Sequence, residues 1–195
     1  MAGVRRFDEE EVLAKAEAVF RQKGYEATSM LDLASATGVQ RGSLYHAYGD
    51  KEELFLRTFG RYEARFLTAT AQVLEGADIR AALTAFFDIA IANMTAGPAR
   101  GCLTTKTAAE GEQTSARIRA EVRGLLDELD ALLAAAFARA GAQGALALPA
   151  DEASRMVVTF TRGLAVMERV YGDAGALRDT ARTLIDLLVP TRPSV

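Results

Sequence analysis

The stretch TSMLDLASATGVQRGSLYHAYGDKEEL, residues 28–54, decides the fold of this chain. It divides into two short helical segments, and a longer helix begins at its end. Ser29 and Asp32 have the spacing of an N-cap pair at the start of the first segment. Gly38 allows a turn that a residue with a Cβ would resist, and Leu44 on the second segment can pack back against the first. The pattern predicts a helix-turn-helix.

The second segment, residues 40–46, is the expected recognition helix. Its side chains include donors and acceptors suited to base edges in the major groove, on Gln40, Arg41 and Ser43. Gly42 would let the helix approach the duplex closely. Other side chains suit phosphates; these are Thr28, Ser29, Tyr45, His46 and Lys51. The alternative is an amphipathic three-helix core whose polar face is only solvated.

The same stretch resembles a known family. The residues that carry the resemblance are Gly38-Val39, Gly42-Ser43-Leu44-Tyr45, Tyr48 and Lys51-Glu52-Glu53-Leu54-Phe55. They look like the DNA-binding signature of the tetracycline-repressor (TetR) family, although position 48 more often holds Phe there. The resemblance implies an all-helical homodimer of about nine helices. It also implies a DNA-binding domain, expected at residues 1–50, and a ligand-binding and dimerisation domain, expected at residues 51–195.

Composition agrees with a helical protein of the cytoplasm. Of 195 residues, 50% are hydrophobic, 25% are charged and only 4 are proline, so an all-α fold is expected. No apolar run is long enough to span a membrane, and the N-terminal residues lack the apolar segment of a signal peptide. The single cysteine excludes an internal disulfide and suits a reducing compartment. We therefore expect a cytoplasmic protein.

The charge balance is awkward for DNA binding. The chain has a formal net charge of −3, and residues 1–60 hold 8 Lys and Arg against 10 Asp and Glu. Phosphate neutralisation normally supplies much of the affinity for DNA. However, several of the acids stand at expected helix starts, where they suit the helix dipole and need not face the duplex.

Helical periodicity covers most of the remaining chain. The expected helices are residues 8–23, 51–74, 79–95, a short one through 106 and 110, then 115–140, 150–171 and 174–189. The last two carry apolar residues on more than one face, so a second packing partner is required. We expect a homodimer joined through these two helices. The alternative is that both helices are central to the monomer.

Aromatic, Met and polar side chains of the middle helices are candidates for a ligand cavity. Ordinary core packing is the alternative for any one of them, and the cavity itself is implied by the family resemblance. The effector would be small and largely apolar or aromatic. The candidates are Phe59, Tyr62, Phe66, Phe86, Phe87, Asn93, Met94, Cys102, Thr107, Phe137, Phe160, Thr161 and Met167.

Cys102 lies in a Gly-Cys-Leu sequence that resembles a motif of one branch of the family, some of whose members sense electrophiles or oxidants. Helix-start amides and nearby basic residues favour a reactive thiol, whereas a small buried hydrophobe is the alternative.

No enzyme motif is evident. The only histidine, His46, has no metal-ligand partner at workable spacing, and phosphate-loop, dinucleotide and nucleophile-elbow patterns are missing. We expect no cofactor and no metal. The sequence predicts a repressor that binds a palindromic DNA operator and is released by a small molecule. The alternative is a dimeric small-molecule-binding or thiol-based sensor with little affinity for DNA.

Overall fold

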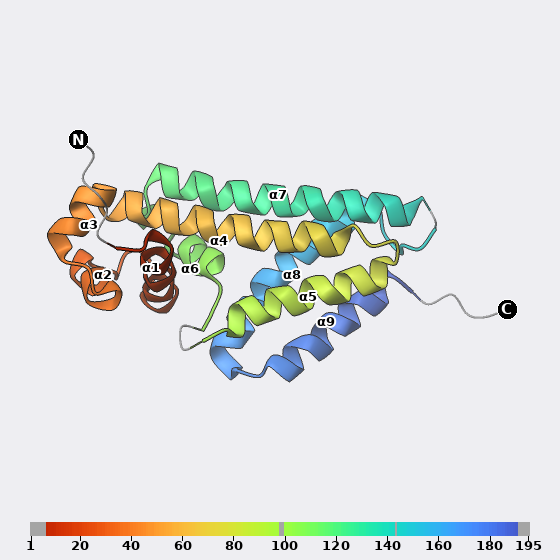
Figure 1. The fold of residues 1–195 in the computed structure, drawn as a ribbon. Coiled ribbons are helices and arrows are strands. Elements are labelled where there is room, and N and C mark those ends of the chain that lie inside the picture. Colours follow the sequence, from red (N-terminus) through yellow and green to blue (C-terminus); the bar gives the residue numbers. More distant parts are fainter. Residues whose placement is uncertain (1–6, 98–99, 143, 191–195) are drawn as a thin grey trace. The chain divides into compact units, whose positions relative to one another are not determined.

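The computed structural model describes residues 7–97, 100–142 and 144–190. Within these residues the chain forms nine α-helices, one 3-10 turn and no strand (Figure 1). The all-α prediction and the expected helix count are confirmed, while the 3-10 turn η1 was not predicted. No helix in this part of the chain has both the length and the hydrophobicity to cross a membrane. The elements are α1 Glu9–Lys23, α2 Met30–Thr37, α3 Arg41–Tyr48, α4 Lys51–Leu74, α5 Ile79–Thr95, α6 Leu103–Glu110, η1 Gly111–Gln113, α7 Ala116–Gly141, α8 Ala150–Tyr171 and α9 Ala174–Leu188.

The chain forms two compact units, and each is built from two separate stretches of sequence. The first unit comprises Met1–Ala64 and Cys102–Arg123, so α6 belongs with α1, α2 and α3. The second unit comprises Arg65–Gly101 and Gly124–Val195, and it contains α5, α8 and α9. The division into functional domains at residue 50 remains a prediction.

In the first unit, α1 packs against α2 and α6. The Asp8 carboxylate accepts hydrogen bonds from amides of the first turn of α1, and Gly24, at φ +91°, ends the helix by donating to Phe20 O at 2.8 Å. The Phe55 ring of α4 meets the rings of Phe20 and Tyr25 edge-on, at 5.0 and 5.1 Å between centroids. This aromatic cluster joins α1, α4 and residues 24–29, which form the connector between α1 and α2.

In the second unit, α5, α8 and α9 lie side by side (Figure 1). The rings of Phe87 on α5 and Phe160 on α8 pack edge to face, 5.9 Å apart. Arg178 of α9 forms an ion pair of 2.9 Å with Asp88 of α5. Gly172, at φ +66°, ends α8 and separates it from α9, as predicted.

Candidate nucleic-acid interface

The helix that precedes the turn, α2, begins with a complete capping box. Ser29 Oγ accepts a hydrogen bond from the Asp32 amide at 3.1 Å, and Asp32 Oδ2 accepts one from the Ser29 amide at 2.9 Å. Lys23, the last residue of α1, pairs with Asp32 Oδ1. The Lys23 ammonium, and then the Ser29 hydrogen bonds, hold the pKa of Asp32 well below its usual range. The predicted N-cap pair is confirmed, and it also ties α2 to α1.

We expect acid to weaken this cap. Because the pKa of Asp32 is lower in the folded chain, its contribution to stability is complete above its ordinary pKa of 3.8 and is lost as pH falls below that value. Asp32→Asn should therefore lower the urea midpoint at pH 7 and reduce the further loss on going to pH 3. The measurement is helicity against urea at both pH values. Asp151→Asn is the control, since Asp151 pairs only within α8; equal pH dependence in wild type and Asp32→Asn would contradict the prediction.

The turn between α2 and α3 depends on Gly38. Its backbone is left-handed, with φ +73°, and its amide donates to Ala34 O at 3.0 Å. This is the usual C-terminal glycine of a helix. Leu44 of α3 and Leu33 of α2 are both fully buried, as close helix crossing requires. The helix-turn-helix is thus assembled from residues close together in the sequence.

The recognition helix is shifted from its predicted position. We predicted residues 40–46, whereas α3 runs from Arg41 to Tyr48. Gln40 has an extended backbone and serves as the N-cap, and Gly49 at φ +86° ends the helix only after Tyr48. The Tyr48 side chain is 2% exposed, so the longer helix adds a core residue.

The residues of this segment that were predicted to contact DNA are all exposed. They are Gln40, Arg41 and Ser43 for bases, Tyr45 and His46 for phosphates, and Gly42 for close approach. The Arg41 guanidinium lies over the Tyr45 ring, 5.4 Å from its centroid, which holds both side chains together. A Cβ at Gly42 would meet no atom within 4 Å, so packing within the chain does not require glycine there.

Two of the residues predicted to contact DNA instead form contacts within the first unit. Thr28 is 2% exposed, and its hydroxyl donates to Gly24 O. The Lys51 ammonium donates to Tyr25 O at 2.9 Å and lies 4.2 Å from the centroid of the Tyr25 ring. Both side chains therefore hold the connector between α1 and α2. Their contact with phosphates stays a prediction that the observed side-chain positions do not favour.

Several of the acidic residues among residues 1–60, which make the net charge unfavourable for DNA binding, form ion pairs within the first unit. On α4, Arg61 pairs with Glu10 at 2.7 Å and with Glu17 at 3.7 Å, both on α1. Arg117, at the start of α7, pairs with Glu53 at 3.1 Å. Within the described residues, no ion pair involves Arg41, so the charge of the α3 surface is not cancelled by a bound carboxylate.

A contact that was not predicted from the sequence ties the connector between α1 and α2 to α6. Glu110, the last residue of α6, accepts hydrogen bonds from the Tyr25 amide at 3.2 Å and the Glu26 amide at 3.3 Å. Burial raises the pKa of Glu110 despite these bonds. A Cβ at Gly24 would stand 2.1 Å from Glu110 Oε1. No sequence pattern indicates this contact, because its partners are 85 residues apart.

The predicted effector residues lie in both units. In the first, Phe59, Tyr62, Cys102 and Thr107 are buried, and the Tyr62 hydroxyl is 3.6 Å from Cys102 Sγ. Thr107 lines a cavity of about 80 Å³, and its hydroxyl makes no hydrogen bond. The buried position of Cys102 agrees with a small hydrophobe more than with an exposed sensor thiol.

In the second unit most of the predicted effector residues are buried, and one is not. The buried or partly buried residues are Phe66, Phe86, Phe87, Asn93, Met94, Phe137, Phe160 and Thr161. Met167 is 46% exposed on α8 and does not belong to this core. Phe87 lines a cavity of about 100 Å³, which is small for an aromatic ligand, as sites for drug-sized ligands span about 300–1,000 Å³. The effector cavity stays a prediction.

Two family models match the chain. Residues 12–58 match that of the bacterial regulatory proteins of the tetR family, and residues 80–184 match that of the tetracyclin repressor-like C-terminal domain. The chain belongs to the tetR family. The predicted resemblance is thereby confirmed at the level of the family, and so is the prediction that this TetR-family protein is not an enzyme. Membership of the branch with a Gly-Cys-Leu motif stays a prediction.

Curated relatives of the TetR-family protein are helix-turn-helix regulators. The transcriptional repressor ComR of Escherichia coli (strain K12) is 39% identical over 107 residues, which are 54% of this chain and 47% of ComR. The repressor BdcR of the same strain is 34% identical over 70 residues, 36% of each chain. The activator FasR of Mycolicibacterium smegmatis is 32% identical over 83 residues, 40% of this chain and 38% of FasR. The chain spans less than half the length of these three relatives.

Solved structures match over almost the whole chain. A cysteine mutant of the TetR-family regulator CifR, complexed with 26-bp double-strand operator DNA, has 27% identity and a TM-score of 0.83, covering 93% of this chain and 97% of that one. The reduced form of NemR from E. coli has 20% identity and a TM-score of 0.80, covering 95% and 98%. The second likeness concerns the fold alone. Among the described residues, no three His, Cys, Asp or Glu side chains cluster as a metal site requires.

Proposed function

We propose that this protein is a cytoplasmic, dimeric transcriptional repressor that binds a palindromic operator and is released by a small, largely apolar or aromatic molecule. The observation that carries the proposal is the exposed surface of α3, with the stacked Arg41 and Tyr45 and the unobstructed Gly42. The operator complex of CifR supports double-stranded DNA as the partner. The names of ComR and BdcR favour repression over activation.

A dimer explains a palindromic operator. Two copies of α3 separated by about 34–36 Å enter successive major grooves on one face of the duplex. Each α3 then reads one half-site, and the symmetry of the operator follows that of the protein. The self-association is assigned to α8 and α9, which carry exposed apolar residues.

The effector is proposed to act through the α5–α8 region, whose aromatic core residues were identified from the sequence. A ligand that binds one conformer better than the DNA-bound conformer shifts the population away from DNA. Ligand and operator then weaken each other by a coupling free energy of about 1–3 kcal/mol. The effector must lower the affinity for the operator by the same factor by which the operator lowers the affinity for the effector.

The test is selection of binding sites from randomised duplex DNA by the full chain. Wild type is expected to enrich a palindrome. The Arg41→Ala/Tyr45→Ala variant should lose it, because the lost base contact of Arg41 costs about 1–3 kcal/mol of specific binding and the lost phosphate contact of Tyr45 weakens binding further. Arg155→Ala is the matched control, since Arg155 is an exposed arginine of α8 whose one ion pair among the described residues is with Asp151.

Failure of wild type to enrich any site at low salt, as a folded dimer, would overturn the proposal. The protein would then be a dimeric small-molecule-binding or thiol-sensing protein with little DNA affinity. If the Arg41→Ala/Tyr45→Ala variant still selected the palindrome, these two side chains would not take part in recognising the operator.

A further inference from the structure

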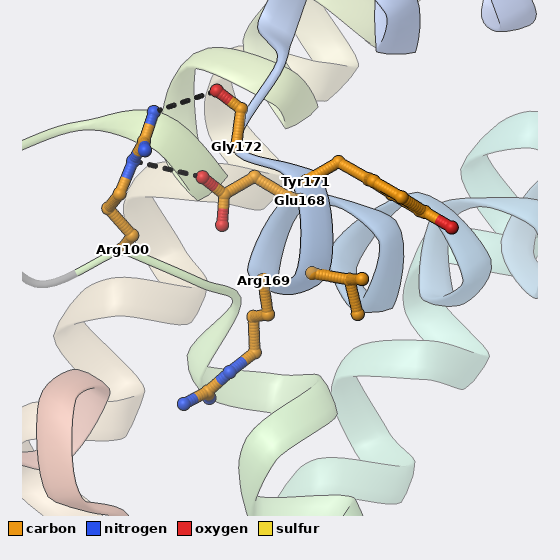
Figure 2. A pocket seen from close by; sticks show the side chains of 6 residues that line it. Arg100, Glu168, Arg169, Tyr171 and Gly172 are labelled. Carbon is orange, nitrogen blue, oxygen red and sulfur yellow. Dashed lines mark hydrogen bonds and ion pairs between the residues drawn. The ribbon is translucent and has the colours of Figure 1, made fainter.

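An open cavity of about 330 Å³ lies at the C-terminal end of α8. It is lined by Arg100, Glu168, Arg169, Val170, Tyr171 and Gly172, all in the second unit (Figure 2). Its volume is within the range of small-molecule sites. None of its residues was among the predicted effector contacts, so the cavity is a separate feature of the molecule.

Glu168 fixes the first of two arginines in this cavity. The Glu168 side chain is 0% exposed, and its Oε1 lies 3.1 Å from Arg100 Nε. Arg100 Nη2 also donates to Gly172 O at 3.3 Å. A buried carboxylate needs a nearby positive charge, so this ion pair holds the guanidinium in place. These two contacts occupy Nε and Nη2 of Arg100, so Nη1 can donate to another acceptor.

Arg169 supplies a second guanidinium, which is uncompensated. Within the described residues its side chain makes no hydrogen bond and no ion pair. It passes over Gly101, where a Cβ would be 3.5 Å from Arg169 Cδ. Figure 2 shows it directed away from the pair formed by Arg100 and Glu168. The cavity therefore carries two positive charges against one buried negative charge.

The groups that the cavity exposes determine whether its ligand should be an anion or a cation. Both Glu168 oxygens are shielded from solvent, so a cation has no carboxylate to contact. The Arg100 side chain, by contrast, is 52% exposed. Tyr171 also lines the cavity and is 75% exposed, and Figure 2 shows its side chain directed away from Arg100. The exposed charge of the cavity is therefore that of its guanidinium groups, which suits an anion.

We propose that this cavity binds a small organic carboxylate. A planar carboxylate matches the paired N–H donors of a guanidinium. Glu168 is a positioning residue, because it holds Arg100 without touching the ligand.

The probe is benzoate, titrated calorimetrically into the full chain. Wild type is expected to bind it with a dissociation constant of about 1 mM or lower. Arg169→Gln should weaken binding about tenfold or more, because a charge-assisted pair is lost. Arg155→Gln, the same change on an exposed arginine elsewhere on α8, should leave it unchanged. Benzamide, which has the same ring without the charge, should bind about tenfold more weakly or not at all.

Three results would overturn the proposal. One is no heat of benzoate binding to wild type at millimolar concentration, and another is equal binding by wild type and Arg169→Gln. The third is no benzoate binding together with a weaker dimer in Arg169→Gln, which would assign the guanidinium to an acid of a second copy. If Arg169→Gln lost helicity, Arg169→Leu would remove the same charge with a strong helix former, and equal benzoate binding by that variant would be the second result in its place.

Discussion

Val166→Arg/Val170→Arg is expected to convert the dimer to monomers at micromolar concentration and to abolish tight operator binding. The two valines are one helical turn apart on α8, and their side chains are 46% and 64% exposed. They lie in a stripe of exposed uncharged residues with alternating spacings of three and four, which is the spacing of helices that pack in bundles. A second stripe lies on α9. On α8 the stripe is Met156, Thr159, Gly163, Val166 and Val170, and on α9 it is Ala176, Thr180, Thr183 and Leu187.

The size of this effect follows from two terms. Each arginine would bring an unpaired charge into an apolar interface, and an uncompensated buried charge costs about 3–5 kcal/mol. A monomer then binds a single half-site and loses the gain from bivalent binding, about 10²–10⁴-fold in affinity. Sedimentation equilibrium and operator titration measure the two effects separately.

Leu31→Arg is the matched control for the oligomeric state. Leu31 is also a highly exposed apolar residue, at 68%, but it lies on α2 in the first unit. Its substitution should leave the dimer intact. A dimer that survived the double substitution on α8 would show that self-association uses another surface.

Gly24→Ala should destabilise the first unit by about 2–4 kcal/mol and reduce operator binding with it. The Gly24 backbone has φ +91° and ψ 173°, a conformation that strains any residue with a side chain. The new methyl group would also stand 2.1 Å from Glu110 Oε1. The connector must then move, and it leads directly into the helix-turn-helix. Urea unfolding followed by helicity measures the loss.

A double-mutant cycle separates the two causes of this loss. Glu110→Ala removes the clash but leaves the backbone strain, so Gly24→Ala should cost less in that background. Gly124→Ala is the control, because Gly124 lies within α7 where a Cβ meets nothing within 4 Å. It should be neutral or stabilising by up to about 1 kcal/mol. An equal cost of Gly24→Ala with and without Glu110 would exclude the clash as a cause.

The helix-turn-helix could be predicted because its determinants are local. The Ser29 and Asp32 cap, the Gly38 turn and the packing of Leu44 all involve residues within about one or two helical turns, where spacing alone specifies geometry. The end of α3 was predicted two residues too early, at residue 46, whereas the helix continues to Tyr48 and Gly49 ends it.

The roles of Lys51 and Arg61 could not be predicted in the same way. Lys51 binds the carbonyl of a residue 26 positions earlier, and Arg61 pairs with an acid 51 positions earlier. Both contacts depend on how helices cross, which a single sequence does not specify. For the same reason Phe86 and Phe137 were predicted as candidates for a cavity without any means of telling cavity lining from core packing, because periodicity gives a buried face and not the empty space beside it.

The return of Cys102–Arg123 to the N-terminal unit limits how the protein can be divided. A fragment ending at Ala64 would retain α1 to α3 but would lack α6, and with it the Glu110 carboxylate that binds the connector amides. The buried side chain of Leu103 would be missing from its core as well. No single cut in the polypeptide separates the two units, so exchanging the whole first unit between relatives requires two segments rather than one.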